Sequence, residues 1–118
     1  MAEQIEMQAL VEAVADFVRG LQLEGQAAFH ARVAAGALGI VARELAQAPR
    51  AAEAAALAGF LGREAPLDTM RAELCGRLRM RQLTPETPGL VEALTAATLA
   101  RLRVDNPRYP TLERLGAA

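Results

Sequence analysis

The 118-residue sequence contains no lysine, no serine and no tryptophan, and it has one histidine, His30, and one cysteine, Cys75. The absence of serine excludes a serine nucleophile, and a single cysteine excludes a disulfide within the chain, which suits the reducing cytoplasm. One histidine and one cysteine give no spacing that is typical of a metal site. The nine glycines form no phosphate-binding loop pattern. The sequence therefore favours a protein without a catalytic site, metal or cofactor, and an enzyme is the least favoured interpretation.

Strong charge and long apolar runs are missing as well. The net charge is −1, so no overall field attracts nucleic acid. The N-terminus is acidic and amphipathic, unlike a signal peptide, and no run of about 18 apolar residues could span a membrane. We expect a cytoplasmic protein whose partners include neither nucleic acid nor membrane. The abundance of alanine and arginine is typical of a GC-rich, bacterial genome.

Apolar residues recur at helical spacing through most of the chain, and strand patterns are absent. The pattern predicts helices over about 3–21, 26–47, 50–61, 68–82 and 88–105. We therefore predict an all-α fold, a compact four- to five-helix bundle in one domain (1–118), with an ordered core of about 5–112. Gly116–Ala118 are expected to fray.

Two helices have apolar stripes that predict their packing. The apolar face of the first consists of Met7, Leu10, Val11, Val14, Phe17, Val18 and Leu21. The second has a 4-3-4-3-4 stripe of Ala27, Ala31, Ala34, Leu38, Val41 and Leu45. The second helix has no wide polar face, which predicts that it lies at the centre of the bundle with the last helix packed along it.

The last helix has the clearest end signals. Thr87 is its predicted N-cap, with Pro88 at the first helical position. Asn106 is predicted to be a left-handed residue after the helix, and Pro107 prevents its continuation. The segment after it, which contains Tyr109, is expected to fold back onto the bundle.

Charged side chains among apolar residues mark the candidate site. Arg101 and Asp105 are four residues apart and project toward the apolar face of the last helix. Three interpretations stay open: an exposed helix pair, a structural network in which Asp105 or Asn106 accepts from Arg32, or a ligand site. The tentative binding residues are Arg32, Arg43, Arg101, Asp105, Asn106, Arg108 and Tyr109.

Three further features of the sequence give separate expectations. Gly36, in mid-helix, costs about 1 kcal/mol against alanine, which suggests a close backbone approach, room for an arginine to lie flat, or a solvated edge. Cys75 is expected to be a small core residue. The arginines at 71, 77, 79 and 81, opposed only by Glu73, predict a solvated face or a basic groove.

Two segments carry a family resemblance: FHARVAAGALGIVAREL (29–45) and LTAATLARLRVDNPRYP (94–110). Together they resemble a family of small, uncharacterised bacterial helical proteins, a domain of unknown function, over about residues 5–110. The resemblance implies an association with aminoglycoside-phosphotransferase-like proteins and acyl-CoA dehydrogenases, and it implies no catalytic residues.

These observations lead to one preferred function and two alternatives. The preferred function is a non-catalytic accessory protein that binds a phosphotransferase-like or acyl-CoA-metabolising enzyme through a helical face. The first alternative is a module that binds a phosphate, a carboxylate or an acyl-CoA through Arg32, Arg43, Arg101 and Arg108. The second is a self-assembling structural domain, such as a homodimer.

Overall fold

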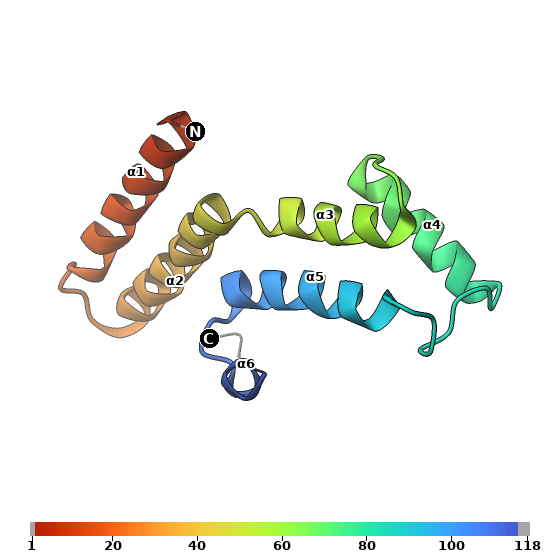
Figure 1. The fold of residues 1–118 in the computed structure, drawn as a ribbon. Helices are drawn as coiled ribbons and strands as arrows, with labels where there is room; N and C mark the ends of the chain where they lie inside the picture. Colours follow the sequence, from red (N-terminus) through yellow and green to blue (C-terminus); the bar gives the residue numbers. More distant parts are fainter. Residues whose placement is uncertain (1, 116–118) are drawn as a thin grey trace. The chain divides into compact units, whose positions relative to one another are not determined.

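The computed structural model describes residues 2–115, and all regular structure in that range is helical. Figure 1 shows the helices in chain order. Their bounds are Ala2–Arg19 for α1, Gly25–Gln47 for α2, Pro49–Leu61 for α3, Leu67–Arg79 for α4, Leu90–Asp105 for α5 and Pro110–Arg114 for α6. The all-α prediction is confirmed, and all five predicted helices are present. The frayed end expected at Gly116–Ala118 lies outside the described residues.

The start of α5 differs from the prediction by two residues. The helix begins at Leu90, and Gly89 precedes it in the left-handed conformation with a φ of 86°. Thr87 closes a turn before the helix, where its Oγ1 accepts a hydrogen bond of 2.9 Å from the amide of Thr84. The prediction of Thr87 as the N-cap is therefore wrong, because its side chain bonds to the turn before the helix and not to the first turn of the helix.

The end of α5 also differs in detail. Asn106 has a φ of −152° and a ψ of 75°, so the prediction of a left-handed residue there is wrong. The ring of Pro107 disfavours the α conformation in the residue before it and favours an extended one. The helix ends at Asp105, as predicted, because Pro107 prevents its continuation.

The contacts divide the chain into two compact units, residues 1–48 and 49–118. The first unit is a hairpin in which α1 packs along α2. The least exposed apolar residues of α2 are Ala28, Ala31, Ala35, Leu38, Ala42 and Leu45. On α1 they are Val11, Ala15 and Val18.

The stripes that make this contact differ from the predicted ones. The predicted α2 residues Ala27, Ala34 and Val41 are exposed, and the packed stripe lies one position further along the chain. On α1, Val11 and Val18 pack against α2, whereas Met7, Leu10, Val14 and Phe17 are exposed. Leu21, which was predicted to belong to this helix, lies after its end and is exposed as well. α1 therefore contacts α2 through one edge of its apolar face and leaves the bulkier part of that face uncovered.

The second unit has the larger core. α3 packs against both α5 and α4. Its buried cluster consists of Leu57, Met70, Leu74, Leu83 and Leu90. The predicted packing of α5 along α2 would join the two units, and it stays a prediction together with the single-domain organisation.

Candidate functional site

The residues predicted to form a site lie in both units. Arg32 and Arg43 belong to α2, while Arg101 and Asp105 belong to α5. Asn106, Arg108 and Tyr109 follow α5 in the turn before α6.

Arg101 and Asp105 form the ion pair that their spacing allows. Arg101 Nη1 lies 3.2 Å from Asp105 Oδ1, and both side chains are partly exposed. Such an i,i+4 pair stabilises a helix by about 0.3–0.5 kcal/mol. This geometry agrees with the exposed-pair interpretation.

The turn after α5 brings Tyr109 back toward that helix. The Tyr109 amide donates a hydrogen bond of 3.0 Å to the carbonyl of Asn106 and closes the turn. Pro110 then begins α6, and Leu112 is 2% exposed. The predicted folding back of this segment is confirmed within the second unit.

An apolar groove, which we call the α5 groove, runs between α5 and the segment around α6, with a volume of about 400 Å³. Its lining residues are Val91, Leu94, Thr95, Thr98, Leu99, Leu102, Tyr109, Thr111 and Leu115. No residue of this lining carries a charge. Of the predicted site residues, Tyr109 lies in this groove.

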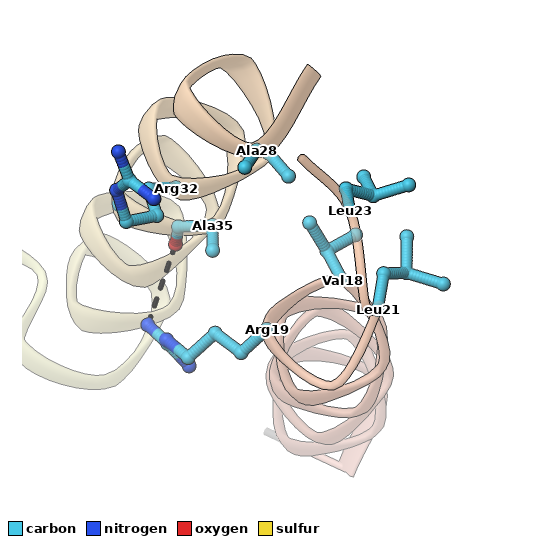
Figure 2. Close-up of a pocket in the computed structure, with 9 residues that line it drawn as sticks. Val18, Arg19, Leu21, Leu23, Ala28, Arg32 and Ala35 are labelled. Carbon is cyan, nitrogen blue, oxygen red and sulfur yellow. Dashed lines mark hydrogen bonds between the residues drawn. The ribbon is translucent and has the colours of Figure 1, made fainter. Parts of the chain in front are cut away.

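A second hollow, which we call the hairpin hollow, lies where α1 turns into α2 and has a volume of about 520 Å³. Figure 2 shows Arg19 reaching from α1 to α2, where its Nη2 donates a hydrogen bond of 3.4 Å to the carbonyl of Ala35. Val18, Leu21 and Leu23 supply apolar side chains on the α1 side. The hollow thus combines cationic and apolar surface.

Arg32 also lines the hairpin hollow, and its side chain makes no hydrogen bond or ion pair with any residue between 2 and 115. Arg19 differs, because its Nη1 also lies 3.3 Å from Asp16 Oδ1. The sequence prediction found Arg32 but missed Arg19, which lies at the end of α1 and has no unusual local pattern. Arg32 is therefore the cation that is left available to an anionic ligand here.

Arg43 lies beside a smaller hollow that also contains Gly39. A Cβ added to Gly39 would lie 3.4 Å from Arg43 Nη1 and 3.5 Å from Arg19 Nη2. At Gly36, no heavy atom lies within 4 Å of such a Cβ. Within this unit, the glycine that two guanidinium groups approach is Gly39, and the space beside Gly36 is open.

The pairing between α3 and α4 was not predicted from the sequence. Arg71 donates hydrogen bonds to both carboxylate oxygens of Glu53, at 2.7 Å from Nε and 2.5 Å from Nη2. The hydrogen bond from Arg71 lowers the pKa of Glu53 from its usual 4.5, against the opposing effect of burial. The two residues are 18 positions apart, so no local sequence pattern predicts the pair.

One other arginine of the predicted basic run, Arg77, is paired too. Glu73 lies between Arg63 and Arg77, and its Oε2 is 2.8 Å from Arg77 Nη2. Together with the pair formed by Arg71, these contacts show that half of the run is used in structural ion pairs.

Cys75 is exposed, so the prediction of a small core residue is wrong. It belongs to α4, whose buried residues are Met70 and Leu74, and Cys75 follows them outside the packed face. Among the described residues, no group of three His, Cys, Asp or Glu side chains could hold a metal ion. No helix in this part of the chain is long and apolar enough to cross a membrane.

Comparison with protein families gives one match. The model of DUF6285, a domain of unknown function, matches residues 21–109. This range includes α2 and every predicted site residue. No curated protein and no solved structure matches the chain.

Proposed function

We propose a function for this chain, which belongs to the DUF6285 family of unknown function: it is a non-catalytic interaction protein that binds a partner enzyme through the α5 groove. The observation that carries the proposal is the uncharged lining of that groove. An apolar surface of this kind on a soluble protein is typical of an interaction site.

The shape of the groove suits a helix from the partner. Val91, Leu94, Thr98 and Leu102 follow each other at steps of three or four residues, so they form one stripe along about three turns of α5. An amphipathic helix binds such a stripe through its own apolar residues at the same spacing. Tyr109, which is partly exposed, supplies an aromatic ring at the rim, a residue type that is enriched at interaction hot spots.

The resemblance described above suggests which enzymes to test. It implies an association with phosphotransferase-like proteins and acyl-CoA dehydrogenases. The test uses purified representatives of both classes and measures binding by calorimetry at tens of micromolar. Failure of both classes to bind would contradict the accessory role.

A matched pair of variants tests the groove itself. Leu94, in the groove, and Leu78, on α4 outside it, are 36% and 38% exposed. We expect Leu94→Glu to weaken partner binding by at least about 30-fold, because a charge would be buried against apolar surface. Leu78→Glu should leave the affinity within about twofold of the unsubstituted chain. Equal effects of the two substitutions would exclude the groove as the binding surface.

The hairpin hollow favours a second candidate function, the binding of a small anionic ligand. Arg32 would hold the phosphate or carboxylate, and Leu21 and Leu23 would contact an apolar part of the ligand. CoA esters in a thermal-shift assay test this function. We expect a saturable rise in melting temperature that Arg32→Ala abolishes and Arg79→Ala, on α4, preserves. A rise that both variants retain would assign the ligand to another place.

A further inference from the structure

The described residues of the α1–α2 hairpin bury little bulky apolar surface. The fully buried apolar side chains are Ala15, Ala35 and Ala42. Alanines bury little apolar surface, and the larger residues beside them (Val11, Val18, Leu38 and Leu45) are only half-buried, so the contact between the two helices is weak by itself. The bulky side chains of α1 lie elsewhere: Met7, Leu10, Val14 and Phe17 are 55%, 66%, 43% and 69% exposed.

Helix geometry places these exposed residues on one face of the hairpin. They recur at steps of three and four, so they form a stripe about 100° around α1 from the stripe that contacts α2. On α2, the stripe next to the packed one on the same side of the hairpin contains Ala34, Ala37 and Val41, all exposed. We call the two stripes together the open face.

The other side of the hairpin is polar, which confirms this assignment of faces. Glu12, Asp16 and Arg19 of α1 lie there beside Gly39 and Arg43 of α2, around the smaller hollow described above. The two sides of the α1–α2 contact therefore differ in polarity. The seven positions of the open face carry no charge, and His30 and Glu44 lie at the two ends of its α2 stripe.

We propose that the open face binds a second copy of this chain, so that two hairpins form an antiparallel four-helix bundle. The face is complementary to itself, because the α1 stripe is bulky and the α2 stripe is mostly alanine. A two-fold axis parallel to the helices lays the bulky stripe of each copy over the small stripe of the other. Facing large and small residues is the arrangement that fills a bundle core without voids.

The two-fold axis also fixes the register. Rotation about an axis parallel to the helices keeps each residue at its own height along them. Ala15 and Asp16 of α1 line the smaller hollow together with Gly39 and Ala42 of α2, so these two segments lie at about the same height. Phe17 of one copy therefore lies over Ala37 of the other, and Val14 lies over Val41.

The size of the open face is sufficient for such a dimer. Its seven side chains leave on the order of 600 Å² of surface exposed, which is at the lower end of the ~600–1,000 Å² that each partner buries in a stable complex. The dimer contact involves the first unit only and does not depend on the function proposed for the α5 groove.

Light scattering coupled to size exclusion tests the dimer on the full chain. We expect twice the chain mass of 12.5 kDa at high concentration, with dissociation on dilution from about 100 µM to about 1 µM. Phe17→Glu should raise the dimer dissociation constant by at least about 100-fold. Phe29→Glu is the matched control, because Phe29 is 51% exposed but lies on the side of α2 turned away from α1. It should leave the dissociation constant within about threefold.

A crosslinking experiment tests the register without a charged substitution. In a Cys75→Ala background, one chain carries Phe17→Cys and a second carries Ala37→Cys. Mild oxidation of the mixture should give a disulfide-linked dimer that contains one chain of each kind. A wild-type chain that is monomeric throughout, equal effects of Phe17→Glu and Phe29→Glu, or absence of the mixed disulfide would each overturn the proposal.

Discussion

The burial of Met70 in the core of the second unit can be tested with a matched pair of methionine substitutions. Met70 is 2% exposed within the cluster of α3, α4 and α5 residues, whereas Met80, just after α4, is 72% exposed. Substitution of each by alanine removes the same atoms from the same unit. The two substitutions therefore differ only in what surrounds the side chain.

The expected size of the effect follows from burial. Met70→Ala removes the buried end of the side chain from contact with residues such as Leu57 and Leu74. Loss of a buried methionine side chain costs about 2–4 kcal/mol, because transfer and cavity terms add. For a unit of this size, that lowers the melting temperature by at least ~10 °C. Met80→Ala should change the unfolding free energy by less than ~0.5 kcal/mol.

Thermal unfolding followed by tyrosine fluorescence makes the measurement specific. The chain has no tryptophan, and its one tyrosine, Tyr109, lies in the second unit. The signal therefore reports on the unit that contains both methionines. Similar melting temperatures for Met70→Ala and Met80→Ala would refute the placement of this core.

Three further predictions concern single positions. Glu53→Gln should destabilise the chain near neutral pH, which lowers the urea concentration at the midpoint of unfolding relative to the wild type. This difference in midpoint should disappear as the pH falls through the lowered pKa of Glu53, below its usual 4.5, because the paired carboxylate then becomes protonated. A difference that persists in acid would contradict this prediction. Gly36→Ala should raise the unfolding free energy by up to ~1 kcal/mol, since the Cβ enters open space in mid-helix, and a loss of stability in a urea titration would show an unseen contact there. Gly89→Ala should cost about 1–3 kcal/mol in the same titration, because its φ of 86° is strained for alanine, and a neutral effect would indicate a different backbone at the start of α5.

The helices themselves were predictable because their signals are local. Proline and glycine end helices through sterics within one or two residues, and apolar spacing acts within a few turns. Pro107 thus ended α5 at the predicted place. The start was displaced by two residues, because Thr87 bonds to the amide of Thr84 in a turn whose geometry no propensity specifies.

The packed face of α2 could not be predicted from the local sequence pattern. Two neighbouring stripes of α2 consist of small apolar residues, so periodicity cannot distinguish them. One contains Ala27, Ala34 and Val41, and the other contains Ala28, Ala35 and Ala42. Contact with α1 selects the second stripe and leaves the first exposed. The same contact places the guanidinium of Arg19 near Gly39, whereas the sequence indicated Gly36 as a position with room for an arginine.

The candidate sites depended on tertiary structure in the same way. The sequence by itself determined the all-α class, the helix positions, the Arg101–Asp105 pair and the folding back of the segment around Tyr109, because each depends on residues a few positions apart. Only the tertiary structure decided that Arg71 binds Glu53, that Arg19 joins Arg32 at the hairpin hollow, and that the bulky stripe of α1 is left exposed. These outcomes depend on which faces are buried together, and burial between segments distant in the sequence is a property that no local pattern encodes.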